Sequence, residues 1–256
     1  MRLEGRTAII TGAGSGFGAA MATEFAKEGA RVVVNDLNDN TGRSVVDDIR
    51  KAGGEAMFHK ANVADGGEVK TMIEAVTDAY GGFNVLINNA GVPQWNQPLT
   101  ETDEETFDRI FDVNVKSIYF TSIHGIPVMK KGGGGVIIHT ASTAATRPRA
   151  GLAWYNASKG AVANLTLTMA QELAPDIRVN AICPGFVDTR WMSRKLHGEE
   201  LDTFMQRVAS ISPLKRMVHA EDVAEAACWF ALGGQAITGQ LLVIDGGTHL
   251  SVGDPI

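Results

Sequence analysis

Short apolar runs alternate with amphipathic stretches along nearly the whole chain. The runs predict buried strands, and the stretches between them repeat their apolar positions with the spacing of a helix. Glycines follow several of these stretches and mark their ends. The expected strands are residues 7–10, 31–35, 56–60, 85–88, 136–139, 178–182 and 241–244. The expected helices are residues 19–28, 40–52, 68–80, 104–129, 154–173 and 220–232, with a kink or last turn at Pro127.

This order of elements predicts an α/β fold. Strands that alternate with helices are joined by crossovers and therefore run parallel. Most of the runs are continuous and rich in Val and Ile, which is typical of a doubly wound sheet covered by helices on both faces. Because we find no linker, repeat or low-complexity tract, we expect one domain over residues 1–256. Residues 185–213 have the weakest periodicity, and we expect a substrate-binding lid or loop there.

Composition and charge narrow the possible partners. The chain has 256 residues, of which 45% are hydrophobic, and a formal net charge of −6, which argues against nucleic acid as a partner. It contains no apolar run of about 18 residues or more, so we expect no membrane helix, and no signal-peptide core follows Met1. The two cysteines, Cys183 and Cys228, form neither a disulfide framework nor a metal-ligand spacing. We therefore expect a cytoplasmic protein without a metal site.

A glycine-rich loop follows the first expected strand and opens the first expected helix. Its sequence from Thr11 to Gly18 is TGAGSGFG. Glycines let the backbone approach a pyrophosphate closely, and a helix N-terminus adds free N–H groups and a favourable dipole. Alone, such a loop is also compatible with a simple tight turn. The strand before it and the helix after it provide the context that dinucleotide binding requires.

Asp36 ends the second expected strand, 24 residues after Gly12. A carboxylate at that place accepts hydrogen bonds from ribose hydroxyls and repels a 2′-phosphate. Neither Ser15 nor Leu37 supplies a cation for such a phosphate. The alternative is an ordinary turn aspartate, but together with the glycine loop Asp36 favours nucleotide binding, and NAD over NADP.

Tyr155 and Lys159 lie four residues apart in an expected helix, so both side chains project from one face. The ammonium favours the phenolate, so a Tyr that normally titrates near pH ~10 is expected to act as a base closer to neutrality. Ser142 follows the strand at 136–139, where its hydroxyl is placed to hold a substrate oxygen as charge develops. Each residue has an ordinary structural alternative, and only the combination indicates proton transfer.

These motifs together resemble the short-chain dehydrogenase/reductase family along nearly the whole chain. The resemblance is carried, in sequence order, by Thr11-Gly12-x-x-x-Gly16-x-Gly18, Asn88-Asn89-Ala90-Gly91, Asn114, Ser142, Tyr155-x-x-x-Lys159 and Pro184-Gly185. It implies a seven-stranded parallel sheet of Rossmann type and the short, single-domain, NAD(P)-dependent branch of the family. It also implies a homotetramer, with the helices at 104–129 and 154–173 as candidate interfaces.

The resemblance implies roles for individual residues. The implied cofactor-binding residues are Gly12, Ser15, Gly16, Phe17 and Gly18 at the pyrophosphate, Asp36 and Leu37 at the ribose, Asn62 and Val63 at the adenine, Asn89, Ala90 and Gly91 along the cofactor, Pro184, Gly185, Val187 and Thr189 at the nicotinamide carboxamide, and Tyr155 with Lys159. Asn62 departs from the Asp that is usual in the family. The implied catalytic residues are Asn114, Ser142, Tyr155 and Lys159, with Tyr155 as the acid/base, Lys159 also on the nicotinamide ribose, and the backbone near Asn114 holding a relay water.

The sequence defines the substrate only loosely. Candidate substrate residues are Ser142, Trp95, Arg149, Trp154, Phe186 and Trp191. Arg147 and Arg149 are suited to a carboxylate or sulfonate, with a solvated loop or a subunit contact as the alternative. The tryptophans are suited to an aromatic wall, or equally to core or interface packing.

Three functions remain open from the sequence. The first is an oxidoreductase (EC 1.1.1.-) that transfers hydride between NAD(H) and a small secondary alcohol or carbonyl, or an aldehyde, with an anionic or aromatic substrate as one option. The second is a 3-oxoacyl-thioester (acyl carrier protein) reductase that uses NADPH, which Asp36 disfavours. The third is a catalytically silent nucleotide-binding regulator, which the complete set of catalytic residues disfavours.

Overall fold

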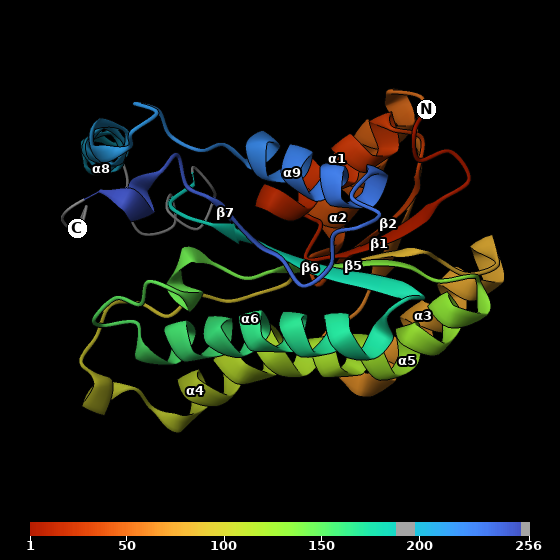
Figure 1. Cartoon of the computed structure of the whole chain (residues 1–256), viewed down its shortest axis with the longest axis horizontal. Coiled ribbons are helices and arrows are strands. Elements are labelled where there is room, and N and C mark those ends of the chain that lie inside the picture. Colours follow the sequence, from red (N-terminus) through yellow and green to blue (C-terminus); the bar gives the residue numbers. More distant parts are fainter. Residues whose placement is uncertain (188–197, 252–256) are drawn as a thin grey trace.

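A seven-stranded, all-parallel sheet forms the centre of the computed structural model, which describes residues 1–187 and 198–251 (Figure 1). The strands follow the order β3-β2-β1-β4-β5-β6-β7. Their bounds are β1 Thr7–Thr11, β2 Arg31–Asp36, β3 Glu55–Lys60, β4 Val85–Asn88, β5 Gly135–Thr140, β6 Ile177–Pro184 and β7 Leu241–Ile244. The predicted doubly wound sheet is confirmed. The strand order reverses direction between β1 and β4, which is where such sheets bind ligands.

Helices cover both faces of the sheet (Figure 1). One layer contains α1, α2 and α9, and the other contains α3, α4, α5 and α6. The bounds are α1 Gly16–Lys27, α2 Asp39–Lys51, α3 Gly66–Tyr80, α4 Glu104–Phe111, α5 Ser117–Lys131, α6 Ala153–Leu173, α8 Glu199–Ile211 and α9 Ala220–Leu232. Within the described residues, no helix is long and apolar enough to cross a bilayer.

Hydrophobic clusters on both faces of the sheet explain the continuous apolar strands. Successive strand residues point to opposite faces, so Ile10 packs in a core with Phe25 of α1, whereas its neighbour Ile9 packs in the other core with Met72 of α3. All four of these side chains are fully buried. Burial of a side chain of this size contributes about 1.5–3 kcal/mol, so a polar residue at either kind of position would destabilise the sheet.

Residues at the helix ends determine where the helices begin and stop, as the two ends of α3 illustrate. The Asp65 carboxylate accepts hydrogen bonds from the N–H groups of Gly67 and Glu68 and caps the N-terminus. Gly81 ends the helix in the left-handed conformation, with φ of 77°. The predicted stop at this glycine is therefore confirmed.

The long helix predicted at 104–129 is interrupted. A π-helical segment, Asp112–Lys116, separates α4 from α5. A π turn holds one residue more than an α turn and often lies at a functional site. Here it contains the buried Asn114, whose side chain binds the backbone of Val92. Pro127 lies within α5, one turn before its end at Lys131.

The segment expected to be a lid contains a helix that we did not predict, α8. Its residues Leu201, Phe204 and Val208 recur with the i, i+3, i+7 spacing of an amphipathic helix. The Phe204 ring packs edge-on against the ring of Phe186, with 5.2 Å between the ring centroids. The helix therefore lies against the loop that follows β6.

Candidate active site

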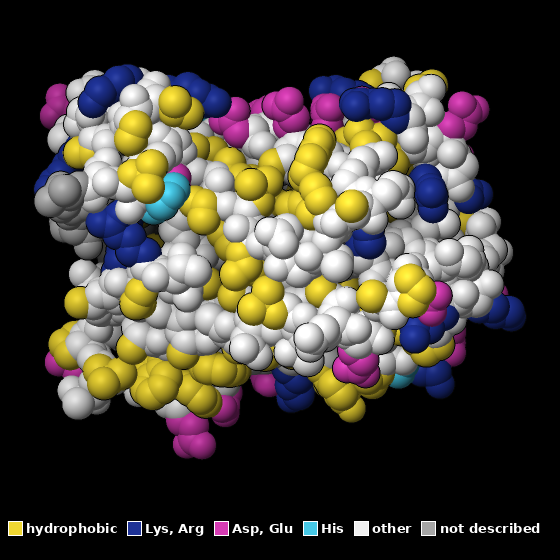
Figure 2. Space-filling view, viewed as in Figure 1, with side chains coloured by type: hydrophobic (Ala, Val, Ile, Leu, Met, Phe, Trp, Pro, Cys, Tyr) yellow, Lys and Arg dark blue, Asp and Glu magenta, His cyan; other side chains and the backbone are white. Residues whose placement is uncertain are grey.

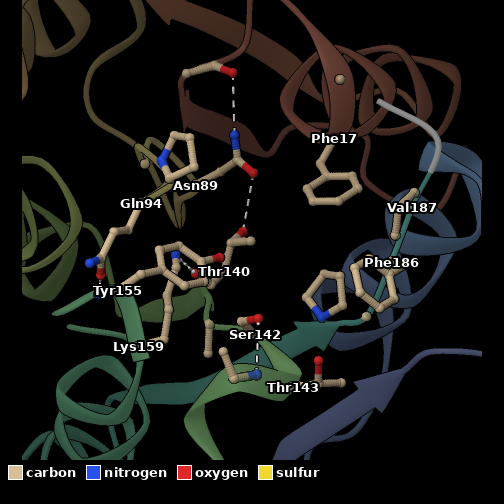
Figure 3. Close-up of a pocket in the computed structure, with 18 of the residues that line it drawn as sticks. Phe17, Asn89, Gln94, Thr140, Ser142, Thr143, Tyr155, Lys159, Phe186 and Val187 are labelled. Carbon is tan, nitrogen blue, oxygen red and sulfur yellow. Dashed lines mark hydrogen bonds between the residues drawn. The ribbon is translucent and has the colours of Figure 1, made fainter. Parts of the chain in front are cut away.

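A pocket of about 350 Å³ opens at the carboxyl ends of β1, β4, β5 and β6 (Figure 3). Its position at the reversal of strand order is the usual ligand site of a doubly wound sheet. Figure 3 shows Tyr155 and Lys159 on one side of the cavity and Phe17, Phe186 and Val187 on the other. The predicted residues that line it are Gly12, Ser15, Gly16, Phe17, Asp36, Asn89, Ala90, Gly91, Trp95, Ser142, Arg149, Tyr155, Lys159, Pro184, Gly185, Phe186 and Val187.

The glycine loop needs its glycines for two different reasons. Gly12 and Gly16 have φ angles of +62° and +55°, which side chains rarely adopt. Gly18 lies behind the pocket, where a Cβ would overlap the Gly12 carbonyl oxygen. Gly18 thus allows α1 to pack tightly against the loop, which leaves the pocket side of the loop open to a ligand.

The first turn of α1 begins within this loop and is suited to an anion. Its N-cap, Ser15, makes no side-chain capping bond, and the first turn contains no acidic residue. The N–H groups of a first turn have no partner within the helix and carry the positive end of its dipole. Together with the open glycine backbone, these groups fit a pyrophosphate.

Asp36 lies at the edge of the pocket and holds the loop in place. Its two carboxylate oxygens accept hydrogen bonds from the N–H of Gly14 at 2.8 Å and of Asn38 at 2.9 Å. Leu37 is 60% exposed and does not line the pocket. Asn62, which accepts a hydrogen bond from the Ala64 N–H, and the buried Val63 also lie outside the lining. The adenine role of these two residues stays a prediction.

Side-chain hydrogen bonds tie the ends of three strands together. The Thr11 hydroxyl accepts the N–H groups of Asn89 and Ala90, each at 3.0 Å, and Asn89 Nδ2 donates to the Thr11 carbonyl at 2.9 Å. The Thr140 hydroxyl donates to Asn89 Oδ1 at 3.2 Å. These bonds give the pocket a floor whose shape is set by β1, β4 and β5.

The structure brings three of the four predicted catalytic residues into contact with the cavity. Tyr155 and Lys159 come from α6, and Ser142 follows β5. Lys159 Nζ donates to the Thr140 carbonyl at 2.7 Å and lies 5.8 Å from the centroid of the Tyr155 ring. The Ser142 oxygen accepts the N–H of Ala144 at 3.1 Å, so its own proton is available to a neighbour.

The pKa values of this group are governed by burial. Burial raises the pKa of Tyr155 to about 12, and hydrogen bonding to Ser142 offsets part of this rise. Burial lowers the pKa of Lys159 to about 8. The expected lowering of the Tyr155 pKa by Lys159 is therefore not met in this structure. The reason is physical: water is excluded from the phenol, and the lysine charge is directed at the Thr140 carbonyl.

Asn114, the fourth member, lies behind the pocket. Its Oδ1 accepts the Val92 N–H at 2.7 Å, and its Nδ2 donates to the Val92 carbonyl at 3.1 Å and to the Ser158 hydroxyl at 3.0 Å. Ser158 in turn donates to the Tyr155 carbonyl at 2.8 Å. The side chain thus holds α6 against the loop after β4, and the relay water at its backbone stays a prediction.

Among the residues that the structure describes, the outer part of the pocket contains two aromatic side chains and the cation of Arg149. Trp95 and Phe186 line it, and the Arg149 guanidinium stacks on the Phe186 ring at 4.0 Å. Trp154 does not line it and packs edge-on against Phe107, with 5.1 Å between the ring centroids. Packing is therefore the observed role of that tryptophan. The predicted residues Thr189 and Trp191 lie outside the described residues.

The Arg147 side chain binds backbone carbonyl groups of the protein itself. Its guanidinium donates to the carbonyls of Thr248, His249 and Ser251 near the end of the described chain. It does not line the pocket. Of the two arginines considered for an anion, the structure places only Arg149 at the cavity.

Several lining residues were not predicted. They are Pro93, Gln94, Thr140, Ala141, Thr143, Ala144 and Leu152. All of them adjoin segments that were predicted, since they follow β4, end or follow β5, or precede α6. Their position at strand ends was the available signal, because the loops after parallel strands form the ligand site.

Comparisons with known proteins agree with this geometry. A family model described as Enoyl-(Acyl carrier protein) reductase matches residues 12–249. The 4-formylbenzenesulfonate dehydrogenase TsaC1/TsaC2 of Comamonas testosteroni is 35% identical over 98% of this chain and 100% of that protein.

Two solved structures have the same fold. A 7α-hydroxysteroid dehydrogenase complexed with NADH and 7-oxo glycochenodeoxycholic acid superposes with a TM-score of 0.90, at 33% identity over 96% of this chain and 95% of that one. A 3-ketoacyl-(acyl-carrier-protein) reductase from Brucella melitensis complexed with NADH superposes with a TM-score of 0.86. It is 40% identical over 96% of this chain and 99% of that one. With its glycine loop, its Tyr155–Lys159 pair and these relatives, the chain belongs to the short-chain dehydrogenase/reductase family of oxidoreductases.

Proposed function

We propose that this protein transfers a hydride between NAD(H) and a small secondary alcohol or carbonyl, or an aldehyde, with Tyr155 as the acid/base. The observation that supports this most is that Ser142, Tyr155 and Lys159 line the same cavity as the glycine loop. Turnover of a panel of alcohols and carbonyls, followed through the absorbance of NADH in both directions, tests it. Binding of NADH without any turnover would instead support a silent regulator.

The residues of the pocket divide the reaction between them. When bound, the cofactor supplies the hydride acceptor in oxidation and the donor in reduction. The Ser142 hydroxyl holds the substrate oxygen, and Tyr155 Oη takes the hydroxyl proton in oxidation or returns it in reduction. A phenolate in a buried site requires nearby positive charge, and Lys159 faces the Tyr155 ring. The glycine loop and the first turn of α1 would hold the pyrophosphate.

The preference for NAD rests on Asp36, and its replacement should reverse it. In an Asp36→Ser/Leu37→Arg variant we expect NADH to bind about 10- to 100-fold more weakly, since bonds to a charged acceptor are lost. NADPH should bind more tightly, because a repelling charge is replaced by a cation. Dissociation constants of both cofactors measure the change. Asp39→Ser is the matched control, since Asp39 pairs with Arg43 on α2 and does not line the pocket; an equal loss in that variant would contradict the assignment.

A second candidate function is the reduction of a 3-oxoacyl thioester, which is supported by a similar protein of known structure. The Brucella melitensis reductase that resembles this chain at 40% identity was solved with NADH. Cofactor preference therefore does not separate the two functions, and the substrate must. Turnover of an acetoacetyl thioester that is many-fold faster than that of any small free alcohol or carbonyl would favour the second function.

We propose further that the substrate is aromatic and carries an anionic group. The stacked Arg149 and Phe186 offer a cation beside an aromatic ring. The relative TsaC1/TsaC2 is named a 4-formylbenzenesulfonate dehydrogenase, after an aromatic aldehyde that carries a sulfonate. A planar guanidinium suits a carboxylate or a sulfonate.

Removal of the guanidinium should separate charged from neutral substrates. For Arg149→Met we expect KM to rise about 10- to 100-fold for benzyl alcohols that carry a sulfonate or a carboxylate at the para position. For unsubstituted benzyl alcohol KM should change less than about threefold, because packing on Phe186 is retained by the methionine. Arg147→Met removes the same charge outside the pocket and serves as the control. An equal rise for the charged and the neutral alcohol would contradict the anion site.

Other properties stand as proposals beside the reaction. We propose one nucleotide-binding domain with a substrate lid around residues 185–213, a cytoplasmic location, and a homotetramer. Support for assembly comes from the exposed apolar residues Tyr119 and Ile123 of α5 and Leu167 of α6. Figure 2 shows further hydrophobic side chains gathered over α4. A sedimentation measurement that gives a monomer would refute the tetramer.

A further inference from the structure

The helix that carries Tyr155 lacks an N-terminal cap from its own sequence. The N-cap residue of α6, Leu152, has no side chain that accepts a hydrogen bond. The first N–H groups of a helix have no partner within the helix, and leaving them buried and unpaired is costly. The missing acceptor comes from a loop about 60 residues earlier in the chain, at Gln94.

We propose that Gln94 is a positioning residue for the acid/base, because its side chain caps α6 and fixes the turn from which Tyr155 projects. Its Oε1 accepts the N–H of Trp154 at 2.9 Å and the N–H of Tyr155 at 3.0 Å. Its Nε2 donates to the Thr102 hydroxyl at 3.3 Å. The inference rests on the proposed function, in which Tyr155 moves the proton.

The surroundings hold Gln94 firmly in this place. Gln94 is 5% exposed as a whole residue, and it lines the pocket beside Tyr155 (Figure 3). The bond to Thr102 fixes the amide so that the oxygen, and not the nitrogen, faces the helix. An amide that reversed its ends would place donors against the two N–H groups, which is unfavourable.

Gln94 and Asn114 hold the first turn of α6 from two directions. Gln94 binds the N–H of Tyr155, whereas Asn114 binds the Ser158 hydroxyl that donates to the Tyr155 carbonyl. Both polar groups of the Tyr155 peptide backbone are thus bound by groups outside the helical ladder. Since helix ends fray without such partners, the cap determines how well the phenol is held against the substrate oxygen.

Gln94 also connects this turn to the substrate wall. It is the neighbour of Trp95, which lines the outer pocket. A second bond joins the same loop to the approach of α6, from the Gln97 N–H to the Gly151 carbonyl at 3.1 Å. A movement of Trp95 on substrate binding would therefore displace Gln94 and change its hydrogen bond to the Tyr155 N–H.

Three variants test the inference. Gln94→Leu keeps the volume and removes the acceptor, Gln94→Glu keeps an acceptor and adds a negative charge, and Gln97→Leu is the matched control. Gln97 donates to the same Thr102 hydroxyl at 2.8 Å but touches no N–H of α6. Its variant should keep kcat within about threefold, since Tyr155 keeps its cap.

For Gln94→Leu we expect kcat to fall about 10- to 100-fold, because a small misplacement of an acid/base is enough for such a loss. The dissociation constant of NADH should change less than about threefold, since the glycine loop is untouched. In the protein without cofactor, hydrogen exchange of the Trp154 and Tyr155 amides should become at least about tenfold faster. This last measurement does not depend on activity.

For Gln94→Glu we expect the two amides to stay protected and the pH profile to move. A negative charge near the phenol favours its protonated form and raises its pKa. Oxidation needs the phenolate, so the rise of kcat/KM with pH should shift to higher pH by roughly one unit. The shift would show that the side chain at position 94 lies close enough to the phenol to act on it directly.

The outcomes separate the inference from the proposed function. An active wild type together with an unchanged kcat in Gln94→Leu overturns the inference and leaves the function intact. Unchanged amide exchange in that variant overturns the cap, even if no substrate is ever found. If Gln94→Leu fails to fold, the pH profile of Gln94→Glu decides, and an unshifted profile overturns the positioning role. Absence of turnover in the wild type over the whole panel counts against the function alone.

Discussion

Tyr155→Phe is expected to lower kcat by about 10²- to 10⁴-fold, the range that positioned acid/base groups contribute, while NADH binds almost as tightly as before. The variant removes one oxygen and keeps the ring, so the packing of α6 and the glycine loop should be unaffected. Turnover in both directions and the dissociation constant of NADH measure the two effects. The loss should be similar for oxidation and reduction, because the same group takes and returns the proton.

Tyr119→Phe is the control for this experiment. Tyr119 lies on α5, is 58% exposed and does not line the pocket. We expect its variant to keep full activity. If Tyr155→Phe retained turnover within a few-fold of the wild type, the proposed proton transfer would be wrong although the family assignment would stand.

Lys159→Met is expected to abolish most activity and to stabilise the protein. Loss of the cation leaves the phenolate without compensation in a buried site, so kcat should fall by about 10²-fold or more. Burial lowers the pKa of Lys159 from 10.5 to about 8, which means that the folded state disfavours the charged form by roughly 3 kcal/mol. The variant also loses the hydrogen bond from Lys159 to the Thr140 carbonyl, and this loss offsets about 1 kcal/mol of the expected stabilisation. We expect a net gain of about 2 kcal/mol in the free energy of unfolding at pH 7, measured by urea denaturation.

The pH dependence of that gain has a definite sign. The unfolded lysine binds its proton up to about pH 10.5, whereas the folded one releases it near pH 8. The destabilisation of the wild type is thus complete below pH 8 and fades as the pH rises toward 10.5. Lys116→Met is the control, since Lys116 is an exposed partner of Asp112 and should change stability by less than about 1 kcal/mol. A variant at position 159 that is less stable than the wild type at pH 7 would contradict this account.

The parts of the fold that depend on the chain's own periodicity were predictable. Buried strands such as Val32–Val34 are continuous because the sheet has a core on each face, and a helix such as α3 carries its own cap and stop. The glycine loop and the Tyr155–Lys159 pair were predictable because each is local in sequence. Those residues also line one cavity in the structure.

The parts that depend on contacts distant in sequence were missed. The π turn around Asn114 is favoured by the backbone of Val92, 22 residues away, and no local pattern marks it. The cap on α6 comes from Gln94, which is ordinary in its own loop. Helix α8 is a different case, since the spacing of Leu201, Phe204 and Val208 is a local signal for an amphipathic helix. The raised pKa of Tyr155 also needed the structure, because burial is not visible in a four-residue motif.

The floor of the pocket is built from strand ends, whereas its outer walls are built mainly from the segments that connect strands to helices. Asn89 and Thr140 line the floor, at strand ends that are hydrogen-bonded to each other and to Thr11. The walls come from the segments at 93–95, 149–152 and 184–187, whose side chains lie outside this hydrogen-bonded floor. Retargeting this protein to a different alcohol is therefore a matter of a small mutational library confined to wall positions such as Trp95, Arg149 and Phe186. Gln94 should be left out of that library despite its place in the same loop, because changing it would impair the chemistry for every substrate at once.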